Sequence, residues 1–212
     1  MNLLTRFLIK EYTYESPANG TIKVVACGGK KTLFVHGIPQ SGGEFVYMWQ
    51  TVIRNLELNQ QANCLVLGVG GGTVIESIRQ YAPKCHITGI EIDPVMIKIA
   101  GEHFGMSADS HLKILNKDAQ IWLQSAKQQK KYHLIVVDLF HGITNPSWTR
   151  EKTSLLLLKR LLLPNGQILF NAHYEPQNPQ EFTQFLTACG SIYKEVKEVF
   201  AYRYNRVLSL RM

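Results

Sequence analysis

Three glycines and one carboxylate are spaced so that they could hold a nucleoside. Gly68, Gly70 and Gly72 follow the apolar run at 63–67, and Glu91 ends the next apolar run, 23 residues after Gly68. Glycines let a chain turn sharply and approach a ligand closely, because they carry no Cβ. In dinucleotide folds an acid about 20 residues after such a loop accepts hydrogen bonds from ribose hydroxyls. The order of strand, glycines, helix, strand and acid predicts an adenosine-type ligand; the alternative is a turn that only needs positive φ.

Asp138 is the strongest candidate for bond-making chemistry. It directly follows HLIVV at 133–137, a run typical of a buried strand. A carboxylate there can accept a proton from an attacking amine, or orient that amine toward an electrophilic carbon. The alternative is an aspartate that only caps a helix or a loop. His141 is a second candidate for the same site, although a single histidine is more often structural.

Further polar and aromatic residues fall near the same predicted site. Asp118 could accept a hydrogen bond from an adenine amino group, cap the helix that follows it, or do both. Tyr47 and Trp49 lie on an early helix and could wall a pocket or belong to the core. An acidic cleft is predicted in a chain whose formal net charge is +7, because the polar residues that follow the strands are Glu91, Asp93, Asp118, Asp138 and those at 173–175. Such a cleft favours a cationic ligand, such as a sulfonium or an ammonium.

An alternation of strands and helices is expected to position these residues. Strands are expected near 63–67, 86–90, 112–115, 132–137 and 166–171. Helices are expected near 73–81, 94–103, 118–127, 149–162 and 178–189. Alternating units form a parallel sheet with helices on both faces, and ligands bind at the carboxyl ends of its strands. The prediction is an α/β, Rossmann-like, mostly parallel sheet, closed by a hairpin at 192–201 and 206–211.

The first part of the chain has a different pattern. Two or three short antiparallel strands are expected within Leu3–Tyr14, 22–26 and 32–35, since these β-rich stretches are separated by turn residues. An apolar helix is expected at about Glu44–Asn55. We therefore expect an N-terminal hairpin region with a linking helix at 1–55 and the nucleoside-binding domain at 56–212.

Length and composition limit the remaining possibilities. The 212 residues, 45% of them apolar, suit one main domain with a small appendage. The lysine cluster at 127–131 is interpreted as a solvated helix end, so no nucleic-acid partner is expected. The cysteines contain no C-x-x-C pair, so no metal is expected, and Cys64 and Cys85 indicate buried thiols in a reducing compartment. The start lacks signal-peptide features and 155–164 is too short and charged to cross a membrane, so we expect a cytoplasmic protein without a membrane partner.

Several of these motifs together resemble a known superfamily. The glycine loop, GIEIDP, KDA, IVVDLF and TSLLLLKRLLLPNGQI resemble the class I S-adenosylmethionine-dependent transferases over about 62–190. Within that fold, LFVHGIPQSGGEFVYMWQ at 33–50 is similar to the spermidine synthases, the polyamine aminopropyltransferases. Gln40, Glu44 and Tyr47 are in matching places, and Ser16 and Asn19 sit where the family has a serine and a glutamine.

The resemblance implies roles for individual residues. The glycine loop and Gln40 would bind the donor, Glu91 its ribose, and Asp118 with Ala119 its adenine. Asp138 would take the proton from the attacking amine, which Tyr47 would help to orient, with His141 nearby. The family implies a decarboxylated S-adenosylmethionine donor, a small diamine acceptor such as putrescine, and a homodimer.

Departures from the family pattern leave three hypotheses open. Gly71 stands where the family has an aspartate that binds the donor's amine, His141 replaces an acid that holds the diamine, and His36 replaces another aspartate. The leading hypothesis is alkyl transfer, aminopropyl being the family expectation, from an adenosyl sulfonium to a small amine. The second is methyl transfer from intact S-adenosylmethionine, whose carboxylate an aspartate at position 71 would repel. The third is a non-catalytic paralogue that keeps the fold.

Overall fold

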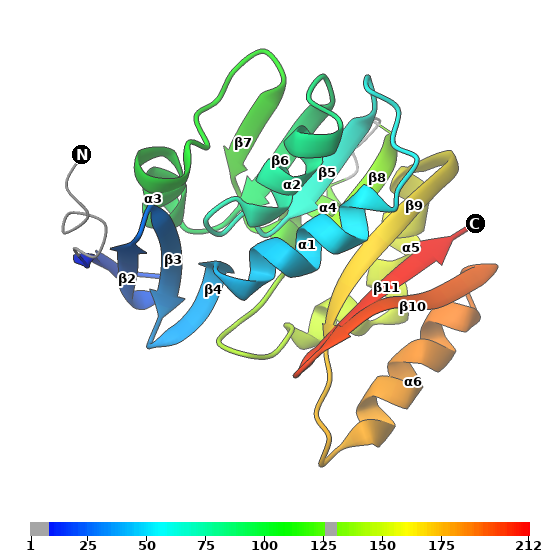
Figure 1. Ribbon diagram of the computed structural model, residues 1–212. Coiled ribbons are helices and arrows are strands. Elements are labelled where there is room, and N and C mark those ends of the chain that lie inside the picture. Colours follow the sequence, from blue (N-terminus) through cyan, green and yellow to red (C-terminus); the bar gives the residue numbers. More distant parts are fainter. Residues whose placement is uncertain (1–8, 126–130) are drawn as a thin grey trace.

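The computed structural model describes residues 9–125 and 131–212, and these residues form two β-sheets and their helices (Figure 1). Within them, a small antiparallel sheet has the strand order β1-β2-β3-β4, and a large sheet has the order β10-β11-β9-β8-β5-β6-β7. The small sheet consists of β1 (Lys10–Ser16), β2 (Gly20–Cys27), β3 (Lys30–Val35) and β4 (Ile38–Gly42). The large sheet consists of β5 (Asn63–Leu67), β6 (His86–Glu91), β7 (Leu112–Asn116), β8 (Tyr132–Val137), β9 (Leu162–His173), β10 (Glu195–Tyr202) and β11 (Asn205–Arg211). The predicted fold class is confirmed.

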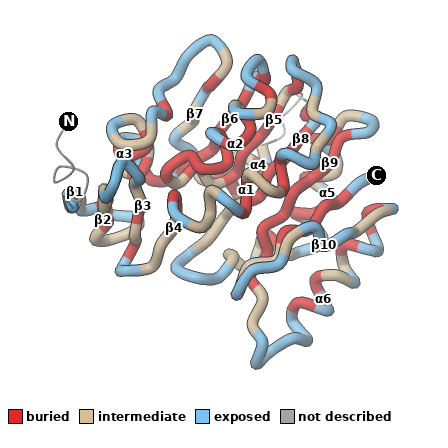
Figure 2. The backbone as a smooth tube through the Cα atoms, viewed as in Figure 1, coloured by how far each residue is buried: buried red, intermediate tan, exposed pale blue. Residues whose placement is uncertain are grey.

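Helices cover both faces of the large sheet. They are α1 (Glu44–Arg54), α2 (Thr73–Tyr81), α3 (Pro94–Phe104), α4 (Ala119–Gln124), α5 (Lys152–Leu161) and α6 (Pro179–Gly190). Buried side chains of α1, α2 and α3 pack in one core, and those of α4, α5 and α6 pack in another. Figure 2 shows the central strands as the most continuously buried segments between these helices. This explains why those strands are continuous apolar runs rather than alternating ones.

The register of the large sheet brings the polar strand ends together. Strands β5 to β9 run parallel, and Leu67 at the end of β5 pairs with both Ile90 and Val137. Val137 in turn pairs with Phe170. The residues that follow these four partners therefore lie along one edge of the sheet, and they are Gly68, Glu91, Asp138 and Asn171. Strands β10 and β11 complete the sheet as the predicted antiparallel hairpin.

The small sheet has four strands, whereas two or three were predicted, and the additional strand is β4. Its sequence, Ile38–Gly42, contains a proline, a glycine and two polar residues, so it lacks the β-branched pattern of a strand. It pairs with β3 because Gly37 and His36 adopt positive φ and reverse the chain. The predicted start at Leu3 lies outside the described residues, and β1 begins at Lys10.

The small sheet is fixed to the large one through α3. Its apolar side chains share a cluster with Met96 and Ile99 of that helix. Asp93, fully buried, caps α3 by accepting from Val95 N at 2.8 Å. The same side chain accepts hydrogen bonds of 2.6 Å each from Ser16 and Asn19. One aspartate therefore both starts a helix and anchors the turn between β1 and β2.

Helix α1, which was predicted as part of the N-terminal region, packs in the core of the large sheet. Met48, Trp49, Val52 and Ile53 are buried there among residues of β5 and α2. The predicted helix at 149–162 is divided into a 3₁₀ turn at Ser147–Arg150 and α5. The final residues of the predicted helix at 118–127, and most of the lysine cluster, lie outside the described residues.

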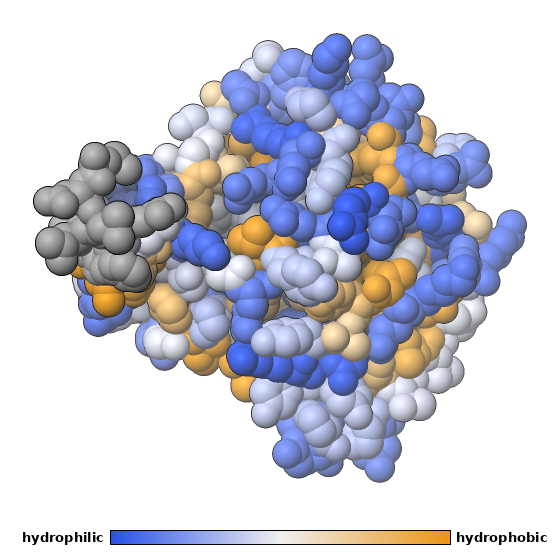
Figure 3. Space-filling view, viewed as in Figure 1, coloured by the Kyte–Doolittle hydropathy of each residue, from blue (hydrophilic) through white to orange (hydrophobic). Residues whose placement is uncertain are grey.

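The visible surface is mostly polar. Figure 3 shows hydrophilic side chains over most of this face, interrupted by smaller apolar areas. None of the helices within residues 9–125 and 131–212 is both long and apolar enough to cross a membrane. Cys64 and Cys85 are buried, as predicted.

Candidate functional site

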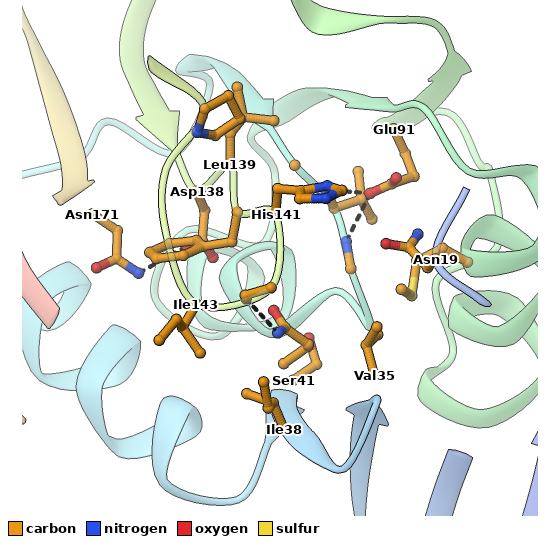
Figure 4. A pocket seen from close by; sticks show the side chains of 18 of the residues that line it. Asn19, Val35, Ile38, Ser41, Glu91, Asp138, Leu139, His141, Ile143 and Asn171 are labelled. Carbon is orange, nitrogen blue, oxygen red and sulfur yellow. Dashed lines mark hydrogen bonds between the residues drawn. The ribbon is translucent and has the colours of Figure 1, made fainter. Parts of the chain in front are cut away.

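A cavity of about 650 Å³ lies at the carboxyl edge of the large sheet. This volume is typical of a pocket for a small molecule or cofactor. We call the part lined by the glycine loop, Glu91 and Asp118 the β6 side. We call the part lined by α1, Asp138, Asn171 and the β10–β11 turn the β9 side. Figure 4 shows Glu91 and Asn19 at one end of the cavity and Asn171 and Ile143 at the other.

Glu91 organises the glycine loop on the β6 side. Its Oε2 accepts hydrogen bonds from Val69 N at 3.0 Å and Gly70 N at 3.1 Å, and its Oε1 accepts from Asp93 N at 3.0 Å (Figure 4). Burial raises the pKa of Glu91, and these three N–H groups act against that rise. A carboxylate has about four acceptor positions, so capacity for about one further hydrogen bond remains, as from a ribose hydroxyl.

Gly68 and Gly70 line the cavity, and Gly68 has no room for a side chain. A Cβ on Gly68 would lie 2.2 Å from the carbonyl oxygen of Asp138, and its φ of +87° disfavours other residues. Gly72 does not line the cavity: it precedes α2 in the left-handed conformation, where a Cβ would meet Met106 at 2.2 Å. Gly68 and Gly72 are therefore both required by tight packing, whereas Gly68 and Gly70 leave their backbone at the cavity wall.

Ser41 of β4 occupies the space beside Gly71. Its hydroxyl accepts a hydrogen bond of 2.8 Å from Gly71 N, and a Cβ on Gly71 would lie 2.7 Å from the Ser41 Cβ. Ser41 lines the cavity, whereas Gly71 is buried behind it. An aspartate at position 71 would therefore need β4 to move, so the change from the family pattern is matched by the packing of a second element.

Asp118 both caps a helix and lines the cavity. It caps α4, where Oδ1 accepts from Ile121 N at 3.0 Å, and it lines the cavity together with Ala119. Ile92, 54% exposed, also lines this end. The apolar side chain of Ile92 could pack against a flat base. The Asp118 carboxylate could accept a hydrogen bond from the amino group of that base.

Asp138 lies between the two sides of the cavity and is partly buried. Loss of solvent raises the pKa of its carboxyl to about 6, while hydrogen bonding from Asn171 and Trp49 acts in the opposite direction. The Asn171 amide donates to Oδ1 at 2.8 Å (Figure 4). A carboxyl whose pKa is close to neutrality can both bind and release a proton.

Asn145 fixes the loop after Asp138. Its amide donates to the carbonyl oxygens of Leu139 at 2.8 Å and Asn171 at 3.0 Å. Its carbonyl oxygen accepts from Arg150 at 2.9 Å and from His173 N at 2.7 Å. This side chain therefore holds the ends of β8 and β9 at a fixed separation, and with them the pair formed by Asp138 and Asn171.

The other predicted residues divide between cavity and surface. Gln40 lines the cavity and donates from Nε2 to the carbonyl oxygen of Gly142 at 2.9 Å, which joins β4 to the loop that carries His141. His141 also lines the cavity, from an exposed position. Tyr47 does not: its side chain is 70% exposed and its ring packs against Phe200. The predicted contact of Tyr47 with an amine stays a prediction, and in this structure Tyr47 lies opposite the buried face of α1.

Three residues of the site were missed from the sequence: Ser41, Asn145 and Asn171. A signal existed for Asn171, since it is the polar residue inside the apolar run ILFNA of β9. Trp49 was considered only as a pocket wall or a core residue. Ser41 and Asn145 sit in loop-like sequence, where nothing local distinguishes them.

Comparisons with known proteins agree with the fold. A family model described as a methyltransferase domain matches residues 64–166. A probable polyamine aminopropyl transferase from Bifidobacterium longum is 34% identical over 124 residues, which are 58% of this chain and 27% of that protein. This chain therefore spans about a quarter of the length of that relative.

Solved structures share the fold over most of the chain. A probable spermidine synthase from Corynebacterium glutamicum has a TM-score of 0.79 at 19% identity and covers 94% of this chain and 79% of its own. Human methyltransferase-like protein 13, in complex with SAH, has a TM-score of 0.67 at 21% identity. The match covers 80% of this chain and 81% of the human chain. Fold and site thus define a class I methyltransferase-fold protein. Within that class, the chain is similar to a probable polyamine aminopropyl transferase in sequence and to spermidine synthases in fold.

Proposed function

We propose that this protein is a transferase that binds an adenosyl sulfonium donor and alkylates a small amine. The observation that carries the proposal is Asp138, whose carboxyl, with a pKa of about 6, borders both sides of the cavity. On the β6 side, Glu91 and Asp118 are in position for a ribose and an adenine. On the β9 side, space remains for a second reactant. The aminopropyltransferase relative supports the same reading.

The reaction balances without a further reactant. The amine nitrogen attacks the carbon next to the sulfonium, the carbon–sulfur bond breaks, and its electron pair neutralises the sulfur. The alkylated nitrogen then gives up a proton, which the Asp138 carboxylate accepts. Asn171 and Trp49 hold that carboxylate, so the rate enhancement comes mainly from positioning.

A second candidate is methyl transfer from intact S-adenosylmethionine. It is favoured by the packing of Ser41 against Gly71, because this packing leaves no room for an acidic side chain at position 71. Without that acid, nothing at this position attracts the ammonium of a decarboxylated donor. Nothing there repels the carboxylate of an intact donor either. The SAH-bound human protein shares the fold. Asp138 would orient the acceptor in either case.

Calorimetry separates these possibilities. S-adenosylmethionine, its decarboxylated form and methylthioadenosine are each titrated into the protein, with and without an amine. We expect methylthioadenosine to bind and one of the two donors to be turned over. Asp138→Asn should abolish turnover and leave methylthioadenosine binding nearly unchanged, whereas Glu91→Gln should weaken that binding. Turnover that survives in Asp138→Asn would contradict the role of Asp138, and absence of any nucleoside binding would contradict the proposal as a whole.

A further inference from the structure

The β9 side of the cavity has an uneven distribution of charge. Within the described residues, its lining contains two carboxylates, those of Asp138 and Glu44, and one guanidinium, that of Arg203. The rest of its lining carries no further carboxylate: Phe45, Leu139, Phe140, Ile143, Pro146 and Trp148 are apolar, and His141, Asn171, Tyr204 and Asn205 are polar. This distribution limits which amine can be accepted next to Asp138.

Glu44 already has partners for both of its oxygens. Arg203 Nη1 lies 3.0 Å from Glu44 Oε1, and the Tyr202 hydroxyl donates to Oε2 at 2.8 Å. The Arg203 guanidinium also lies 5.1 Å from the centroid of the Tyr202 ring. The turn of the β10–β11 hairpin therefore supplies the partners of this carboxylate, and Asp138 is left as the acid that faces an incoming amine.

A diamine is poorly matched to such a lining. Its first ammonium could be received by Asp138, but its second would find no free carboxylate, only apolar or polar side chains without negative charge and the Arg203 cation. Placing a charge there without a partner is costly. A methyl group at the same position would instead gain from burial against the apolar wall.

We propose, building on the function above, that the acceptor is a monoamine with an apolar body, an alkyl or arylalkyl primary amine. Arg203 is the specificity-determining residue, because it neutralises Glu44 and so removes the site that a second ammonium would need.

The test compares two amines of equal size, 1-aminopentane and 1,4-diaminobutane, which differ in whether the far end is a methyl or an ammonium. Each is offered with the donor that the wild-type protein turns over, and kcat/KM is measured by mass spectrometry of the product. We expect kcat/KM for the monoamine to exceed that for the diamine by about tenfold or more. A wild-type protein that prefers the diamine would overturn the inference.

A variant tests the role of Arg203 directly. Arg203 has a φ of +49°, which asparagine tolerates, so Arg203→Asn preserves the turn. It releases Glu44 and should raise kcat/KM for the diamine by about fivefold with little change for the monoamine. Adding Glu44→Gln should remove that gain. Lys197→Asn is the matched control, because Lys197 lies on the same hairpin, pairs with Glu195 and is outside the cavity lining.

The outcomes distinguish the inference from the function on which it rests. If methylthioadenosine binds but the diamine is preferred, or Arg203→Asn leaves diamine use unchanged, only the inference fails. The same holds if methylthioadenosine binds and neither amine is alkylated. If methylthioadenosine does not bind to the wild-type protein, the proposed function fails first.

Discussion

Asp138→Asn should make the protein more stable at neutral pH although it removes the proposed catalytic group. The pKa of Asp138 is raised from 3.8 to about 6, chiefly because its surroundings exclude solvent. A raised pKa means that the folded state favours the neutral carboxyl. This contribution to stability is complete below pH 4 and is lost as the pH rises through about 6. The asparagine amide stays neutral at every pH, so the variant does not lose this contribution to stability as the pH rises.

The size of the effect follows from the shift. A change of one pKa unit corresponds to about 1.4 kcal/mol, so a rise from 3.8 to about 6 corresponds to about 3 kcal/mol when the group is fully ionised. Asp138 is partly exposed toward the cavity, and this screening reduces the expected value to about 1–3 kcal/mol. For a chain of this length, that is a difference of roughly 2–10 °C in Tm.

The assay is thermal unfolding of the wild type and Asp138→Asn between pH 4.5 and 8. The Tm advantage of the variant should grow from pH 4.5 to about pH 7 and then level off. Asp109→Asn is the control, since hydrogen bonding from the His111 backbone N–H lowers the pKa of Asp109 below its ordinary value. That carboxyl is ionised in the folded and unfolded states throughout this range, so the Tm of Asp109→Asn relative to wild type should stay nearly constant. A Tm difference for Asp138→Asn that is constant across this range would refute the reasoning.

Three further variants test the site. Gly68→Ala should lower stability by more than about 1 kcal/mol and abolish methylthioadenosine binding, because its Cβ would lie 2.2 Å from the Asp138 carbonyl oxygen; wild-type-like calorimetry would contradict this. Tyr47→Phe should leave kcat and KM unchanged, since the Tyr47 side chain is 70% exposed; a large rise in KM for the amine would restore its predicted role. Asn145→Asp should cost about 1–3 kcal/mol in urea unfolding, because it replaces an amide that donates to two carbonyl groups with an acceptor; an unchanged midpoint would show that the loop does not depend on it.

Much of the fold could be predicted from the sequence because its signals are local. Continuous apolar runs predicted the central strands to within a few residues, and Pro94 after Asp93 predicted the start of α3. Strand β4 was missed because its pairing with β3 depends on the positive-φ turn at His36 and Gly37. The residue pattern did not indicate that turn. The predicted homodimer and cytoplasmic location stay predictions, and light scattering would test the first.

The sequence by itself determined which polar residues end the parallel strands, since a strand followed by a turn places its next residue at the carboxyl edge whatever else surrounds it. Gly68, Glu91 and Asp138 were identified in this way. Only the tertiary structure decided what those residues face. Ser41 against Gly71 and Arg203 against Glu44 join segments 30 and 159 residues apart. Such contacts depend on sheet register and on the rotation of α1, and these are set by packing of the whole core, which no local pattern specifies.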